Sequence, residues 1–305
     1  MALSTQYNLD YLKKLIRGIY DNTLKEKETF YDKFVNIIDT DDAYEIWDQD
    51  SGLGYWQIIE EHGSPMIDMP TKGGQKRLDL YKYGLAFAVT EKMKRFDKWD
   101  RAAKLAKQLA NKGRETIDLT VASILNNAFS SSYTGFDGQP LCSASHTILR
   151  TGATWSNTPS SAVSIGLTAF QNALIHFATM LDDSGAPSPM KIAYLITHPA
   201  NQIVVEEILR SQLQPYTADN TENIYKGLVK PIYNPYLTSQ TAWFFVGPQD
   251  KGLIGEGHSM ILLMNQEPKL RDWDDPATGT TYFAADGYWQ VGFLHARGVY
   301  GDEGV

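Results

Sequence analysis

The sequence predicts an α+β fold, and three patterns indicate this class. A long amphipathic helix is expected from residue 97 to about 128, and a two-stranded ribbon is expected over residues 55–90. Short helices and strands then alternate over residues 164–264, and a closing run of long strands follows over 269–301. Local helices are thus combined with strand pairing between distant parts of the chain.

The composition is that of a folded chain without an export or membrane segment. The chain is 43% hydrophobic and carries a net charge of −8. Its length of 305 residues suffices for one large domain or two modest ones. A protein that mainly wraps nucleic acid is usually basic, so any DNA contact here must be local. Charged residues interrupt the first 20 positions, no apolar run reaches bilayer length, and Cys142 is the single cysteine. We expect a protein made in a reducing cytoplasm, with no membrane partner.

Residues 8–38 are predicted to be helical, because apolar side chains recur on one face. These side chains are Leu12, Leu15, Ile16, Ile19, Phe30, Phe34, Ile37 and Ile38. Two interpretations are open. The segment is either an arm that packs on another surface or a helical hairpin within one globule.

The ribbon over residues 55–90 is predicted from side chains that alternate about a glycine-rich turn, Pro70-Thr71-Lys72-Gly73-Gly74. The flanking apolar residues are Trp56, Ile58, Met66, Ile67 and Met69 before the turn, and Tyr81, Tyr83, Leu85, Phe87 and Val89 after it. An isolated two-stranded ribbon is marginal in water. We therefore expect the ribbon to lie on other protein, with its tip on a neighbouring subunit. The predicted tip residues are Thr71, Lys72, Gly73 and Gly74.

The helix over 97–128 has one apolar face and one basic face, and would be roughly 45 Å long. The apolar face carries Ala102, Leu105, Ala106, Leu109, Ala110 and Ile117. The basic stripe on the other face is Arg101, Lys104, Lys107 and Arg114. Clustered positive charge on an acidic chain favours an anionic partner. The alternatives are a solvated face, or pairing with acids of the N-terminal segment such as Glu26 and Glu28.

The second half of the chain alternates between helices and strands. A helix is predicted over 164–181, because apolar residues recur at helical spacing before an Asp-Ser-Gly stop. The remaining predicted elements are a strand at 192–197, a helix at 199–213, a polar loop at 214–225, and strands at 228–233, 243–247 and 260–264.

Reactive side chains do not form a site by their spacing. Cys142 and His146 are close in sequence, but no nucleophile-elbow motif surrounds them. The acidic groups at 60–62 and 272–275 lack the loop spacing of a calcium site, and an exposed turn explains the second group better. The histidines lack zinc-ligand spacing.

Two further chemistries are also disfavoured by the sequence. The glycines Gly252, Gly255 and Gly257 lack the Lys-Ser/Thr ending of a phosphate-binding loop. Lys72 and Lys76 lie near the predicted ribbon turn, and nothing in the sequence identifies an asparagine partner for a covalent link between subunits. We expect no catalytic residue, no cofactor and no metal.

Several segments, in order, resemble the Hong Kong 97 (HK-97) type capsid fold, most closely the Mu-like major head subunit branch. Residues 138–146 with Ser156-Asn157 resemble the Leu-Phe-Ser-x-x-His and Ser-Asn signature of that family, with Cys142 where a Phe is more usual. The other matching segments are 83–93, 196–200, 208–209, 229–233, 241–245 and 295–301. The resemblance extends from about residue 45 to the end of the chain.

The resemblance implies a layout of four parts. They are an N-terminal arm (1–45), an extended β-ribbon loop (46–92), a peripheral domain with a long spine helix (93–163 and 265–305), and an axial domain (164–264). We expect no scaffolding domain ahead of the arm, so that any scaffold would be a separate protein. In this fold the spine helix lies against the inner wall, so the basic stripe is expected to face packaged DNA.

The implied function is that of a major capsid protein, and not of an enzyme. Such a protein self-assembles as pentamers and hexamers into an icosahedral phage shell around double-stranded DNA. Its expected partners are further copies of itself, packaged DNA bound non-specifically, and separate scaffold, portal and decoration proteins. Its expected location is the virion capsid, assembled in the host bacterial cytoplasm. The alternatives are an encapsulin-like nanocompartment shell, a cytosolic hydrolase that uses Cys142 and His146, and a monomeric binding module.

Overall fold

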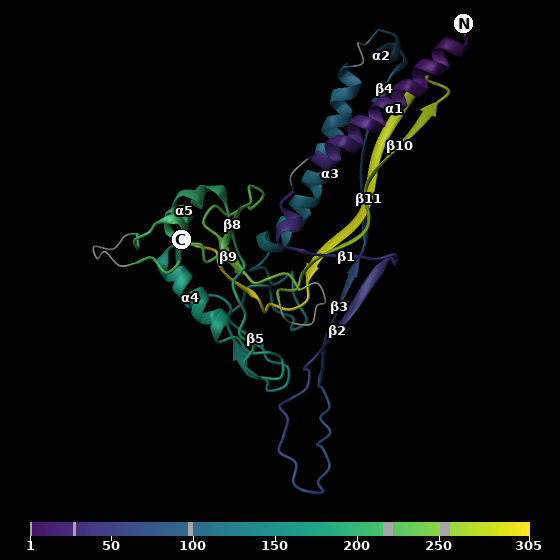
Figure 1. Ribbon diagram of the computed structural model, residues 1–305. Helices are drawn as coiled ribbons and strands as arrows, with labels where there is room; N and C mark the ends of the chain where they lie inside the picture. The colour runs from purple at the N-terminus through teal and green to yellow at the C-terminus, as the bar shows by residue number, and fades with distance from the viewer. Residues whose placement is uncertain (1, 27–28, 97–99, 216–221, 251–256) are drawn as a thin grey trace.

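The molecule is elongated, with long helices and strands at one end, a second lobe beside them, and a loop that projects away from both (Figure 1). The computed structural model describes residues 2–26, 29–96, 100–215, 222–250 and 257–305. Strands in these ranges form two four-stranded sheets and two two-stranded ribbons. No helix in the same ranges has the length and apolar character needed to cross a membrane.

The first sheet has the strand order β1-β10-β11-β4. β1 runs parallel to β10, whereas β11 is antiparallel to both β10 and β4. Its strands are β1 (Asn36–Asp39), β4 (Tyr81–Val89), β10 (Met260–Asp275) and β11 (Thr280–Phe293). Helices α1 (Ala2–Glu26) and α3 (Asp100–Asn126) run along this sheet (Figure 1). Their apolar stripes meet it in a core that includes Ile16, Ala106 and Phe283.

The helix predicted over residues 8–38 is wrong in its second half. There the chain forms a 3-10 turn, η1 (Tyr31–Lys33), and then β1. The buried carboxylate of Asp118 on α3 accepts the backbone N–H groups of Phe30 and Tyr31 at 2.9 and 3.0 Å, which directs the chain into the sheet. In the first half, α1 packs on α3 of the same chain, so residues 8–38 do not form a helical hairpin of their own.

The second sheet has the strand order β12-β9-β7-β8 and forms the lobe that also holds α4 and α5 (Figure 1). Its strands are β7 (Tyr194–Thr197), β8 (Lys230–Tyr233), β9 (Trp243–Val246) and β12 (Val299–Asp302). Its helices are η2 (Pro199–Asn201), α4 (Leu167–Ala178) and α5 (Gln202–Arg210). All four side chains of β9 are buried. Trp243 and Phe245 pack with α4 and α5, and Phe244 and Val246 pack on the opposite side in a core that includes α3.

The predicted division between residues 264 and 265 falls inside strand β10. β10 pairs with β11 without interruption of the sheet from Met260 to Asp275, although the register shifts twice on the way. The end of the chain also changes sheet, since β12 pairs with β9 and not with the first sheet. Gly298 permits this return with a φ of +77°, where a Cβ would meet the backbone N of His258 at 2.9 Å.

The predicted ribbon is shifted along the chain. β2 (Tyr44–Asp50) pairs with β3 (Lys72–Asp79), and the next strand, β4, leaves this ribbon to join β11. The expected glycine turn lies inside β3. A Cβ on Gly74 would lie 2.1 Å from the carbonyl oxygen of Phe136, so these glycines serve close packing and not a turn.

The other helices and strands agree in type with the sequence prediction and differ at their ends. The long helix is confirmed as α3, with residues 97–99 outside the described ranges. The helices predicted over 164–181 and 199–213 shorten to α4 and α5. Short elements that were not predicted are α2 (Glu91–Phe96), β5 (His146–Thr147) and β6 (Thr154–Trp155).

Candidate assembly surface

Residues 51–71, called the apolar loop below, join β2 to β3 and project from the body (Figure 1). Trp56 and Ile58 are fully exposed, at 101% and 99% of their maximal areas. The other exposed apolar side chains of the loop are Leu53, Tyr55, Ile59, Met66, Ile67 and Met69. An exposed apolar surface of this extent is typical of a protein–protein interface.

The two arms of the apolar loop make little use of each other's backbone. Among the described residues, the backbone hydrogen bond that joins them runs from Ser51 N to Thr71 O, at 3.0 Å. The far end is closed by a tight turn in which Gly63 N donates to Glu60 O at 2.8 Å and His62 has a φ of +66°. The tip of the loop is therefore at residues 60–63. The open backbone groups, like the apolar side chains, are free for a partner.

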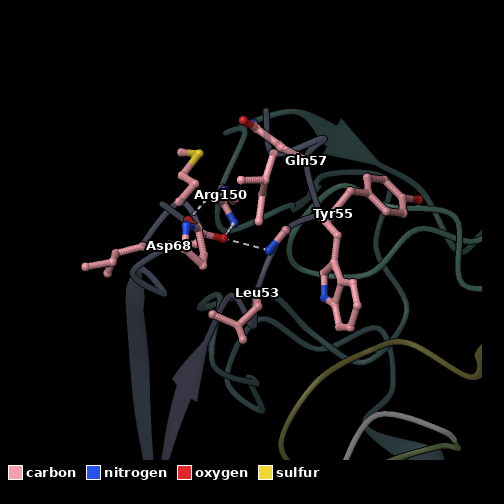
Figure 2. A pocket seen from close by; sticks show the side chains of 11 residues that line it. Leu53, Tyr55, Gln57, Asp68 and Arg150 are labelled. Carbon is pink, nitrogen blue, oxygen red and sulfur yellow. Dashed lines mark hydrogen bonds and ion pairs between the residues drawn. The ribbon is translucent and has the colours of Figure 1, made fainter. Parts of the chain in front are cut away.

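A cavity of about 620 Å³ lies between the arms near the base of the loop (Figure 2). Apolar side chains of both arms line most of it, and Arg150 of the body closes one side. The lining residues are Leu53, Gly54, Tyr55, Trp56, Gln57, Ile59, Pro65, Met66, Ile67, Asp68 and Arg150. The cavity has no enzyme-like set of acid, base and nucleophile, and its walls suit an apolar side chain.

A charged contact, called the loop clamp below, joins the apolar loop to the body (Figure 2). Arg150 donates two hydrogen bonds to the carboxylate of Asp68, at 2.6 and 2.9 Å. The same carboxylate accepts the backbone N–H of Gly54 from the opposite arm at 2.7 Å. The hydrogen bonds from Arg150, followed by the one from Gly54, lower the pKa of Asp68 to about 2. The clamp therefore stays charged at any physiological pH.

The residues predicted to form the ribbon tip lie at the base of the apolar loop instead. Lys72 pairs with Asp50 in the β2–β3 ribbon, and Thr71 is bonded to Ser51. Gly73 and Gly74 lie against the body, where a Cβ on Gly73 would meet Leu149 at 2.8 Å. The prediction mistook two packing glycines for a turn. A contact of these four residues with a neighbouring subunit stays a prediction.

Three of the four residues of the predicted basic stripe share exposed positions on α3, namely Arg101, Lys104 and Lys107. Arg114 does not belong with them. Its guanidinium is 14% exposed and donates to Tyr31 Oη and, at 3.3 Å, to Leu24 O beside the end of α1. The helical wheel could not show this, because the fold of the N-terminal segment decides which part of α3 is covered. Of the two acids proposed as partners, Glu26 is exposed, and Glu28 lies outside the described residues.

The sequence of residues 74–301 matches the family described as phage capsid protein. The chain belongs to the phage capsid protein family. No curated protein sequence matches it.

Solved structures share the fold of this capsid protein at low sequence identity. A Microbacterium phage Oxtober96 chain aligns with a TM-score of 0.58 and 8% identity, over 90% of this chain and 91% of that one. The capsid of the cyanophage P-SCSP1u aligns with a TM-score of 0.58 and 12% identity, over 90% of this chain and 88% of that one. A virus-like particle from Pyrococcus furiosus aligns with a TM-score of 0.53 and 11% identity, over 95% of this chain and 98% of that one. These chains have a mixed α+β capsid fold in common with this one.

The Cys142–His146 segment of this capsid protein is held by a buried hydrogen-bond network, and Cys142 is not an exposed nucleophile. Asn157 Nδ2 donates to Leu141 O at 2.7 Å, and its Oδ1 accepts the backbone N–H of Ser143 at 2.8 Å. Both ring nitrogens of His146 face oxygens, Asp137 Oδ2 at 2.7 Å and Asn157 Oδ1 at 3.1 Å. Burial raises the pKa of the Cys142 thiol, which opposes thiolate formation. The family and fold are those of a structural protein.

The acidic residues of the 272–275 group, considered for metal binding, have protein partners. Lys13 of α1 contacts Asp272 at 3.1 Å and Asp274 at 2.6 Å, and Arg17 contacts Asp272 at 2.5 Å. In the described part of the chain, no three His, Cys, Asp or Glu side chains are grouped to hold an ion. Of the glycines considered for phosphate binding, Gly252 and Gly255 lie outside the described residues.

Proposed function

We propose that this protein is the major shell subunit of a tailed-phage head, which assembles as pentamers and hexamers into an icosahedral shell around double-stranded DNA. The observation that carries the proposal is the apolar loop of a phage capsid family member, whose fully exposed Trp56 and Ile58 have no cover within the subunit. The partner that completes this surface is a second copy of the chain.

We assign the parts of the molecule to the HK-97-like plan with two changes from the sequence-based layout. The first sheet with α1 and α3 is the peripheral domain, and it takes all of β10. The second sheet with α4 and α5 is the axial domain, and it takes β12 from the C-terminal segment. The apolar loop is the distal part of the extended loop. The order of motifs from 83–93 to 295–301 supports placement in the Mu-like branch.

The energy of assembly comes from surface that one subunit leaves in water. Covering one tryptophan side chain removes roughly 200 Å² of surface, which contributes about 5 kcal/mol before the entropic cost of association. Each subunit in a closed shell both offers its apolar loop and receives one, so modest contacts combine by multivalency. Separate scaffold, portal and decoration proteins are further proposed partners.

The test replaces residues 55–67 with a Gly-Ser linker of equal length. This variant keeps Gly54, Asp68 and the packed strand β3, so the subunit should retain its circular dichroism and melting temperature. Negative-stain microscopy and sedimentation should show particles for the wild type and only free subunits or small oligomers for the variant. Normal shells from the linker variant would refute the role of the apolar loop in assembly.

We further propose that Arg101, Lys104 and Lys107 face the packaged DNA and bind phosphate without reading sequence. Their exposure on an acidic chain supports this role. The double substitution Lys104→Glu with Lys107→Glu should leave empty shells intact and make DNA-filled particles less stable, most clearly at low salt. Failure of empty shells to form would assign these residues to protein contacts instead.

A nanocompartment shell with a protein cargo is the weaker alternative. The alignment with 98% of a virus-like particle chain from Pyrococcus furiosus supports it, because the fold alone does not separate the two classes. The match to the phage capsid protein family favours the phage head. Portal and terminase genes beside the coding gene would support the phage head, and a cargo gene would support the alternative.

A further inference from the structure

Two sets of contacts hold the apolar loop, and the inner set joins its two arms to each other. Ser51 N donates to Thr71 O at 3.0 Å, and Thr71 N donates to Ser51 Oγ at 2.9 Å. Ser51 is buried, so these bonds close the ribbon at the point where the loop begins. The contact between these two residues does not fix the direction of the arms beyond it, because the arms can still pivot about their common base.

The outer set is the loop clamp, in which one carboxylate joins three separate segments. Asp68 belongs to one arm, Gly54 to the other arm, and Arg150 to the body (Figure 2). The planar guanidinium contacts both carboxylate oxygens, which restricts orientation as well as distance. A Cβ on Gly54 would lie 3.2 Å from both Arg150 and Asp68, so the arm approaches the ion pair closely.

Arg150 is itself well placed to hold the loop, because its backbone is anchored. It lies in a tight turn where Gly152 N donates to Ile148 O at 2.8 Å, and its own N–H donates to Asp183 O at 3.0 Å. The side chain of Asp183 accepts hydrogen bonds from Gln49 on β2 at 3.2 Å and from Arg297 at 3.1 Å. The clamp thus continues into a network that includes the base of the ribbon and the C-terminal segment.

We propose that Arg150 is a positioning residue for assembly, which holds the apolar loop in the direction needed to meet a second copy of the chain. This proposal rests on the proposed shell function. The clamp fixes the two arms before the partner arrives, so assembly does not have to order them. The side chains of Arg150 and Asp68 are 32% and 24% exposed, so their pair contributes little to the stability of the subunit itself.

The test compares Arg150→Met with a matched control, Arg77→Met. Arg77 forms an exposed ion pair with Asp79 at 2.6 Å on β3, away from the apolar loop. Both variants lose one positive charge and keep an unbranched side chain. Amide hydrogen exchange at Gly54 and across residues 53–67 is measured on unassembled subunits, and the critical concentration for shell formation is measured by light scattering.

For Arg150→Met we expect exchange of the Gly54 amide to accelerate and the critical concentration for shell formation to rise, each by roughly tenfold, with an unchanged melting temperature. Arg77→Met should change neither the exchange rate nor the critical concentration. Arg150→Lys should have a smaller effect on both than Arg150→Met, because an ammonium keeps the charge but cannot make the bidentate contact. Unchanged exchange at Gly54 in Arg150→Met would overturn the clamp. Faster exchange with an unchanged critical concentration would overturn its role in assembly. A failed shell function would appear separately, as a wild-type protein that forms no particles.

Discussion

The apolar loop and strand β9 are both rich in aromatic and aliphatic residues, yet the structure treats them in opposite ways. Trp243 on β9 is 0% exposed and its indole N–H donates to Val163 O at 2.8 Å. Trp56 in the loop is 101% exposed. β9 has a strand on each side and helices over it, whereas the loop has neither. Hydrophobic residues therefore stabilise the subunit in one region and remain in water in the other.

This comparison separates two properties, the stability of the subunit and its assembly, which point substitutions can test. Substitutions in the core should change the free energy of unfolding, and substitutions in the apolar loop should change assembly alone. The four predictions below probe that separation.

The largest effect is expected for Phe245→Ala in β9. The ring of Phe245 is 0% exposed and packs edge-on against Phe170 and Trp243. The ring centroids are 4.9 Å apart in the first pair and 5.5 Å apart in the second. Its removal leaves a cavity in the second core and should lower the free energy of unfolding by about 4 kcal/mol. Urea unfolding followed by circular dichroism measures this loss. A loss below about 1 kcal/mol would show that the lobe is not held by this core.

A pH effect of similar size should act on the body and not on the loop clamp. Burial lowers the pKa of His258 to about 4 and that of His176 to about 4. Between pH 6.5 and 4 the unfolded chain binds protons that the folded chain excludes, so stability should fall as pH falls through this window. His258 alone accounts for about 3 kcal/mol by pH 4. Asp68 stays ionised there, since its pKa is about 2.

Urea unfolding of the free subunit at pH 7, 6 and 5 checks this expectation, with His258→Gln as the control. The control should have a shallower dependence on pH, because one of the buried imidazoles is gone. A flat profile between pH 7 and 5 in the wild type would contradict it.

A smaller effect is expected at the junction between the two regions. Gly74→Ala places a methyl group 2.1 Å from the Phe136 carbonyl, and the backbone shift should cost about 2 kcal/mol. Gly18→Ala on the exposed face of α1 is the matched control, because nothing lies within 4 Å of the new Cβ. The control should stabilise the helix by about 1 kcal/mol. Equal melting temperatures for the two variants would contradict the close packing of β3.

The smallest effect on subunit stability is expected for Trp56→Ser in the apolar loop. The side chain is fully exposed, so the free energy of unfolding should change by less than about 0.5 kcal/mol. Particle yield should nevertheless fall sharply, as measured by sedimentation. A subunit destabilised as strongly as Phe245→Ala would remove the distinction between the two regions.

Much of the local structure could be predicted because its signals are local. The apolar stripe of α3 has helical spacing, and the short strands β7, β8 and β9 lie within one or two residues of their predicted bounds. The motif around 138–146 and 156–157 was recognised in the sequence. Its physical basis appears only in the structure, where Asn157 connects Leu141, Ser143 and Val299.

The candidate site was predicted less well, because its geometry depends on distant partners. The alternation over Tyr81–Val89 is that of a strand, but nothing in it indicates pairing with β11, some two hundred residues later. Once β4 is taken by β11, β3 must pair with β2, and the loop moves to residues 51–71. The available signal for this loop was the set of glycines and prolines that interrupt regular structure, namely Gly52, Gly54, Gly63, Pro65 and Pro70.

The sequence by itself determined the α+β class, the long helix and the likeness to phage capsid proteins, because periodicity and motif order are properties of the chain. The tertiary structure decided which side chains have partners. It partly covered Arg114 beside Tyr31, placed Gly74 against Phe136 and left Trp56 in water. Exposure is a property of the whole packed molecule, since a residue is covered only by elements that reach it from elsewhere in the chain.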